Sequence, residues 1–167
     1  MARRTKRTLL STLVILGEGA CEKAFLSYLK DLYAKNTGQK ITLQSADGGS
    51  PEDIVKTAIK KSRDIAYDRK FILMDSDIVI NDTTIALAKE ANINIILSEP
   101  LCLEGMLLKL LGQKIPNSSQ KCKSLLHPQL DGKATDKNSY KKLITVEMLE
   151  QSNIKQIILL LNIIKNL

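Results

Sequence analysis

The chain has 167 residues, of which 44% are hydrophobic and 26% charged, and its formal net charge is +7. These values are typical of one globular domain with a sizeable core, and no apolar stretch is long enough to span a bilayer. The basic charge favours an anionic partner, nucleic acid ahead of a membrane surface.

The hydrophobic pattern predicts four strands, each followed by a helix. Apolar runs that end in charge or glycine predict buried parallel strands, and apolar residues three and four positions apart predict helices. The predicted strands are 9–16, 40–46, 70–74 and 92–97, and the predicted helices are 20–35, 51–66, 83–91 and 103–111. Because parallel strands are joined by right-handed crossovers, this alternation predicts an α/β fold with a central parallel sheet between helices.

The pattern changes after Gly112. The segment 113–138 is polar and rich in serine and lysine, which predicts a long irregular loop. The last segment, 145–167, predicts one or two helices whose apolar face packs on the domain or on a second subunit of a homodimer. We therefore assign 1–112 to an α/β domain and 113–167 to a basic loop and C-terminal helices that pack on the same domain.

Lysines are concentrated in this second part of the chain. Between Lys109 and Lys142 there are eight lysines and two acids. Such a surface is suited to contacts with phosphate groups, although a solvated lysine-rich loop is an equally good interpretation. The lysines that we select as candidates for binding nucleic acid are Lys121, Lys123, Lys141 and Lys142.

The three cysteines, Cys21, Cys102 and Cys122, are odd in number and lack the C-x-x-C spacing of many metal sites. This usage predicts reduced and mostly buried thiols in a cytoplasmic protein, and it argues against a structural zinc site.

Acidic residues follow three of the four predicted strands. Glu18 lies after the first strand between two glycines, Asp75 and Asp77 follow the third, and Glu104 follows the fourth. Ligands of parallel sheets bind beyond the carboxyl ends of the strands, so these carboxylates should meet at one crevice. Clustered carboxylates repel each other, and a bound Mg²⁺ or Mn²⁺ is the simplest way to stabilise them.

The turn after the first strand contains two further features, its glycines and Glu22. The glycines of Gly17-Glu18-Gly19 are expected to supply backbone freedom where the strand turns into the helix. Glu22, four residues after Glu18, is close enough in sequence to reach the same crevice. Its alternative role is that of a first-turn acid stabilised by the helix dipole.

The order of these motifs resembles the Toprim domain of topoisomerases, primases and OLD-type nucleases. Glu18-Gly19-Ala20-Cys21-Glu22 looks like the E-G-x-x-[DE] turn of that family, and Asp75-Ser76-Asp77 looks like its Asp-x-Asp. The segment 98–105 with the following Met106-Leu107-Leu108 is similar to the S-x-P-C-x-E-x-x-L-L segment of RloB-like proteins, a Toprim branch linked to bacterial defence. The resemblance covers roughly residues 9–112.

The resemblance implies a Mg²⁺-dependent site for phosphoryl transfer. By carry-over, Glu18 would be a general acid or base or a metal ligand, and Glu22 a supporting catalytic residue. Asp75 and Asp77 would be metal ligands, with Glu104 in support. The ATPase motif G-x-x-x-x-G-K-[ST] is absent from this sequence, so if the activity needs an ATPase, that ATPase is a separate subunit.

The function expected from the sequence is therefore that of a metal-dependent nuclease acting on DNA or RNA. One alternative is a catalytically degenerate Toprim module that binds nucleic acid or a partner. A second is a nucleotide-sugar glycosyltransferase, which also uses Asp-x-Asp but usually needs a longer chain. A Cys-His or Ser-His-Asp enzyme is disfavoured, because His127, the one histidine, precedes Pro128 in the predicted loop and fits a structural or surface role.

Overall fold

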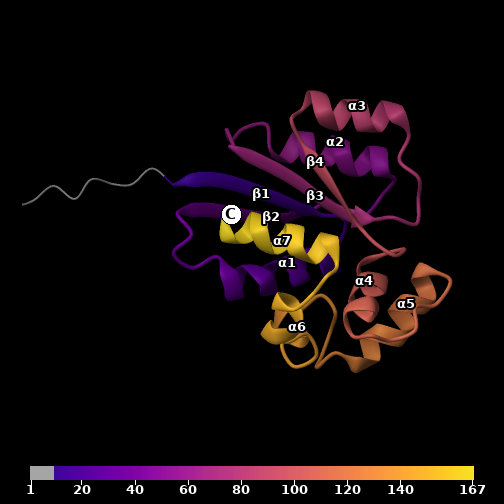
Figure 1. The fold of residues 1–167 in the computed structure, drawn as a ribbon. Helices are drawn as coiled ribbons and strands as arrows, with labels where there is room; N and C mark the ends of the chain where they lie inside the picture. The colour runs from indigo at the N-terminus through magenta and orange to yellow at the C-terminus, as the bar shows by residue number, and fades with distance from the viewer. Residues whose placement is uncertain (1–9) are drawn as a thin grey trace, which may run out of the picture.

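A four-stranded, all-parallel sheet is the centre of the computed structural model, which describes residues 10–167 (Figure 1). The strands are β1 (Ser11–Gly17), β2 (Gln39–Ser45), β3 (Arg69–Asp75) and β4 (Asn94–Ser98). Their order across the sheet is β2-β1-β3-β4. The predicted α/β fold with a parallel sheet of four strands is confirmed. Leu9, the first residue of the first predicted strand, lies outside the described residues.

Helices cover both faces of this sheet. Helices α1 (Ala20–Tyr33) and α7 (Lys155–Lys165) lie on one face, and α2 (Pro51–Lys61) and α3 (Asp82–Glu90) lie on the other (Figure 1). Alternate residues of the strands face the two layers, as the two-residue repeat of a strand requires. Leu73 belongs to the core under α1 and α7, whereas its neighbours Ile72 and Met74 belong to the core under α2 and α3.

The C-terminal segment packs on the core beneath α1. Helices α6 (Val146–Glu150) and α7 follow each other, as predicted, and Ile157 and Leu160 of α7 are fully buried. The side-chain amide of Gln39 donates to the carbonyls of Ile163 and Ile164 at 3.0 and 2.7 Å. These contacts fix the end of α7 to the start of β2, so the extension and the sheet share one core.

The segment after Gly112 is more ordered than the sequence predicted. Helices α4 (Leu103–Leu110) and α5 (Ser119–Leu126) pack side by side beyond the carboxyl ends of the strands (Figure 1). Short 3₁₀ turns follow at His127–Gln129 and Lys137–Tyr140. The prediction of an irregular loop over 113–138 was therefore wrong. The buried side chains of Cys122 and Leu126, four residues apart, hold α5 against the core although its other residues are mostly polar.

Two glycines allow helices to approach the loops that carry the candidate site. A Cβ atom at Gly17 would lie 2.7 Å from the Cβ of Glu22, and one at Gly105 would lie 2.1 Å from the carbonyl oxygen of Pro100. Neither Gly17 nor Gly19 has a positive φ. The prediction that backbone freedom explains the glycine at position 17 was therefore wrong. A glycine is needed there because α1 begins directly against the end of β1 and leaves no room for a side chain.

Helix α2 ends five residues earlier than predicted. The hydroxyl of Ser62 donates to the carbonyl of Ala58 at 2.7 Å and closes the last turn.

Among residues 10–167, no helix has both the length and the apolar character needed to cross a membrane.

Candidate metal and active site

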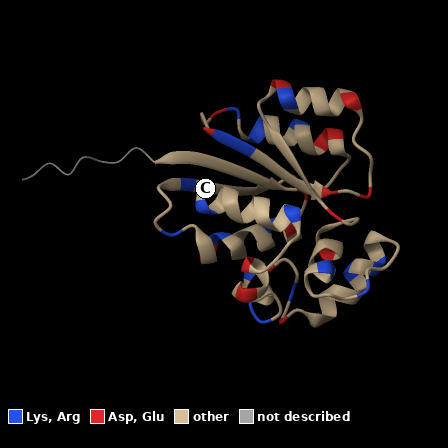
Figure 2. Cartoon of the chain, viewed as in Figure 1, with Lys and Arg blue, Asp and Glu red and all other residues tan. Residues whose placement is uncertain are grey.

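A pocket of about 230 Å³ opens at the carboxyl edge of the sheet. It lies between the β1–α1 turn, the end of β3 and the helices α4 and α5. Figure 2 shows acidic residues at the ends of the strands and lysines on α5. The residues that line the pocket are Glu18, Gly19, Ala20, Cys21, Glu22, Gly48, Asp75, Glu104, Lys123 and His127.

Glu18 and Asp75 join the ends of the two central strands. The backbone N–H of Asp75 donates to Oε2 of Glu18 at 2.8 Å, and the N–H of Glu18 donates to the carbonyl of Leu73 at 2.9 Å. The N–H of Leu103, the first residue of α4, donates to Oδ1 of Asp75 at 3.2 Å. These bonds hold Glu18 and Asp75 at the floor of the pocket, as the parallel sheet predicted.

The surroundings of Asp75 disfavour the ionised form of its carboxyl group. It is 9% exposed. Burial, together with the nearby carboxylates of Glu22 and Glu18, raises its pKa from 3.8 to about 8. The hydrogen bond from Leu103 opposes this shift and does not cancel it. A cation in the pocket would favour the ionised form of Asp75.

Glu22 is nearly buried, and its position fits both of the interpretations considered for it. Its Oε2 accepts a hydrogen bond of 2.8 Å from the N–H of Gly19, which caps the start of α1. It also lines the pocket, where burial is the main cause that raises its pKa and Glu104 and Glu18 add to the effect.

Asp77 is separated from the other acids. Its side chain is exposed, and its Oδ2 accepts a hydrogen bond of 2.5 Å from the hydroxyl of Ser119. Its backbone N–H and that of Ser76 both donate to the carbonyl of Leu101, at 3.0 and 2.9 Å. Thus the two aspartates of Asp-x-Asp do not converge, and Asp77 is not among the residues that line the pocket.

Glu104 lies at the start of α4 and is 1% exposed. Its Oε1 lies 2.7 Å from Nε2 of His127, while its Oε2 has no hydrogen-bond partner among the described residues. The sequence analysis placed Glu104 at this edge correctly. It missed His127, which the helix α5 brings into the pocket.

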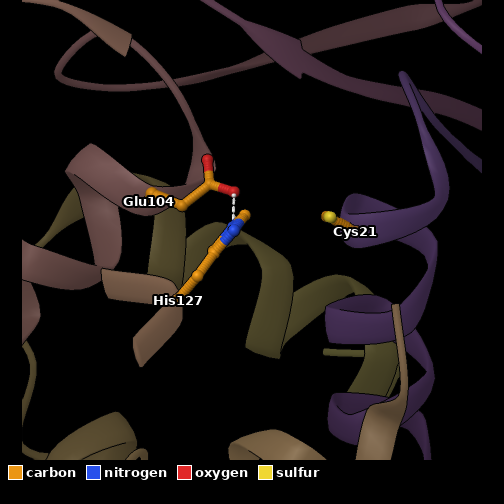
Figure 3. Close-up of side chains that lie close together, drawn as sticks. All are labelled: Cys21, Glu104 and His127. Carbon is orange, nitrogen blue, oxygen red and sulfur yellow. Dashed lines mark hydrogen bonds and ion pairs between the residues drawn. The ribbon is translucent and has the colours of Figure 1, made fainter. Parts of the chain in front are cut away.

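Cys21 completes a group of three donor side chains with Glu104 and His127 (Figure 3). Their sulfur, oxygen and nitrogen atoms all lie within 4.8 Å of one another. Burial, followed by the charges of Glu104 and Glu22, raises the pKa of the Cys21 thiol to about 11. The three cysteines are free, as predicted, with Cys102 and Cys122 buried and Cys21 partly exposed.

The four candidate lysines do not form one surface around the pocket. Lys123 lines it; burial lowers the pKa of its amine, but the nearby acidic groups, Glu104 and Asp75 foremost, together raise it above its usual value. Lys121 is exposed and donates to the side chain of Asn117 at 3.1 Å. Lys142 pairs with Asp131 at 2.6 Å, and Lys141 is exposed.

Comparisons of the chain with protein-family models, with curated proteins and with solved structures found no match. The function is therefore argued from the pocket itself.

Proposed function

We propose that the protein is a Mg²⁺- or Mn²⁺-dependent phosphodiesterase that cleaves nucleic acid, as expected for a Toprim-like nuclease. The observation that carries the proposal is the position of Glu18 and Asp75. They are linked to each other at the ends of adjacent central strands, in a pocket where Asp75 is destabilised as an anion. In a chain of net charge +7, this local excess of carboxylates is the feature that most needs a cation.

The residues present are compatible with such a cation. Glu18, Glu22 and Asp75 offer carboxylate oxygens, the donor type that Mg²⁺ and Mn²⁺ prefer. Among the described residues, only Cys21, Glu104 and His127 bring three donor atoms within 4.8 Å of one another. The carboxylate oxygens of Glu18, Glu22 and Asp75 are more widely spaced than that. This spacing is acceptable for Mg²⁺, because that ion usually keeps several waters and binds through one or two carboxylates.

Three side chains in the pocket then have defined tasks. An ion held here would supply Lewis-acid polarisation of a phosphoryl oxygen and a water of lowered pKa. Asp75 would provide the charge that holds this ion. Glu18 is half-buried at the floor and is placed to exchange a proton with an attacking water or a leaving group. Lys123 supplies a positive charge to a phosphate group in the same pocket.

The position of Asp77 supports a second candidate function. Asp77 was expected to be a metal ligand, but its carboxylate accepts a hydrogen bond from Ser119 and does not line the pocket. A protein of this kind would bind nucleic acid through its basic residues without cleaving it. The two functions predict different responses to metal ions.

Cleavage of supercoiled plasmid and of a structured RNA, each with Mg²⁺, Mn²⁺ or a chelator, tests the proposal. The matched variants are Asp75→Asn and Asp77→Asn, which make the same chemical change inside and outside the pocket. We expect metal-dependent cleavage by the wild type and Asp77→Asn, and a loss of about 100-fold or more in Asp75→Asn. Binding of both substrates without cleavage by the folded, metal-replete wild type would support the binding module instead.

A further inference from the structure

A group of donors with a different chemistry forms one wall of the same pocket. Cys21 lies in the first turn of α1, Glu104 in the first turn of α4, and His127 directly after α5. These elements are far apart in the sequence, yet Figure 3 shows the three side chains directed toward a common space. Their donor atoms lie within 4.8 Å of one another.

We propose that Cys21, Glu104 and His127 bind a Zn²⁺ ion and leave a fourth coordination position open to the pocket. One sulfur, one oxygen and one nitrogen match the ligands of zinc sites, and three protein ligands with an open position are typical of sites that bind water or substrate. A thiolate ligand disfavours Mg²⁺, which prefers hard oxygen donors. The site is therefore distinct in chemistry from the one formed by Glu18, Glu22 and Asp75.

The separations fit zinc after a small contraction. Zinc holds these donors at about 2.0–2.3 Å, so neighbouring donors of a tetrahedral site are roughly 3.2–3.8 Å apart. Donors at the widest separation, 4.8 Å, would have to approach each other by roughly 1–1.6 Å. The bond of 2.7 Å between Glu104 and His127 must open to admit the ion. His127 has room to move, since 37% of its side chain is exposed.

Glu104 gives an independent indication of a missing ligand. Its side chain is 2% exposed, and one of its two carboxylate oxygens has no hydrogen-bond partner among the described residues. A buried carboxylate that lacks a partner is costly, and native structures rarely leave one without an explanation. An ion bound at the group would give the unpartnered carboxylate oxygen of Glu104 a ligand to coordinate.

Titration of the chelator-stripped protein with Co²⁺, followed by absorption spectroscopy, tests the proposal. Co²⁺ occupies zinc sites and reports a thiolate ligand by a near-ultraviolet charge-transfer band and tetrahedral geometry by intense visible bands. We expect both signals in the wild type, and we expect Zn²⁺ to displace them. Cys21→Ser should lose the charge-transfer band, and His127→Gln should keep it but bind Co²⁺ at least about 10-fold more weakly.

Two variants serve as controls. Cys122→Ala removes a buried thiol outside the group and should keep both signals. Asp75→Asn should also keep them, which separates this proposal from the phosphodiesterase proposal, on which it does not depend. A wild type without a thiolate band overturns the zinc site. A band that persists in folded Cys21→Ser, or disappears in Cys122→Ala, also overturns it.

Discussion

The two walls of the pocket differ in how the chain builds them. The oxygen wall, formed by Glu18, Glu22 and Asp75, comes from the ends of strands β1 and β3 and the first turn of α1. The mixed wall, formed by Cys21, Glu104 and His127, requires three helices to pack against one another. Neighbours in sequence, Cys21 and Glu22, serve different walls because successive helix residues point in different directions.

The local sequence therefore determines the oxygen wall more fully than the mixed wall. The carboxyl ends of parallel strands meet at one edge whatever the details of side-chain packing, so acids placed there converge. The mixed wall exists only because α5 is present and ends at His127. Substitutions in each wall therefore test whether the two walls are built in these different ways.

The largest disruption is expected at Gly105, because α4 carries Glu104 of the mixed wall and its Leu103 N–H donates to Asp75 of the oxygen wall. A methyl group there would meet the backbone carbonyl oxygen of Pro100 at 2.1 Å, so either α4 or the backbone at Pro100 must shift. We expect Gly105→Ala to lower the free energy of unfolding by about 3 kcal/mol in urea denaturation.

The matched control is Gly112→Ala, which has open space around the added methyl and a φ of +69°. Only backbone strain opposes that change, so it should cost about 1 kcal/mol. Equal effects of the two substitutions would contradict the close approach at Gly105.

Glu104→Gln should weaken both walls at once. The substitution keeps the size of the side chain but removes a carboxylate charge that belongs to the mixed wall and also acts electrostatically on Asp75 in the oxygen wall. We expect Co²⁺ affinity and metal-dependent cleavage each to fall by about 10- to 100-fold. Glu99→Gln, which alters an exposed acid bonded to Gln156, should leave both unchanged. If only one property falls, Glu104 belongs to that wall alone.

The pH dependence of stability should separate Asp75 from Asp77. The pKa of Asp75 is about 8 in the folded protein and about 4 when unfolded, so the folded state binds the extra proton. The stability that this proton contributes is complete below about pH 4 and is lost as the pH rises through about 8. Glu22, whose pKa is also raised, adds to the same trend.

With a chelator present, we therefore expect the free energy of unfolding to decline between about pH 5 and pH 8. Asp75→Asn should flatten this decline and be more stable than the wild type by about 2 kcal/mol at the alkaline end. Asp77→Asn should follow the wild type. Urea denaturation across this range measures the slopes, and parallel slopes for Asp75→Asn and the wild type would argue against a destabilised Asp75.

The smallest expected effect distinguishes two lysines of α5. Lys123 lines the pocket beside both walls, whereas Lys121 is exposed. We expect Lys123→Ala to weaken binding of single-stranded nucleic acid by about 5-fold and to reduce the salt dependence by about one phosphate contact. Lys121→Ala should change the affinity by less than about 2-fold. A reversed ranking in fluorescence anisotropy would mean that nucleic acid contacts another surface.

The residues themselves explain how far the sequence could lead. The sheet was predictable, since the apolar run 71–74 between Lys70 and Asp75 belongs in a buried parallel strand, and the end of that run placed Asp75 at the edge. The divergence of Asp77 was not predictable, because it depends on a bond to Ser119 in a helix that the sequence analysis had not found.

His127 was missed for the same reason. Its position depends on α5, whose few apolar residues lie among lysines and serines. The spacing of Cys122 and Leu126, with Ser118 as the N-cap, was the available signal for that helix. The contact between His127 and Glu104, however, comes from the packing of α4 on α5, which local sequence does not encode.

Binding of Mn²⁺ to the chelator-stripped protein, measured by the loss of the free-ion signal in electron paramagnetic resonance, tests whether the pocket holds a divalent cation. We expect the wild type and Asp77→Asn to bind Mn²⁺ and folded Asp75→Asn not to bind it. Absence of binding by the wild type, or equal binding by Asp75→Asn, would contradict the claim that Asp75 in this pocket holds a divalent cation.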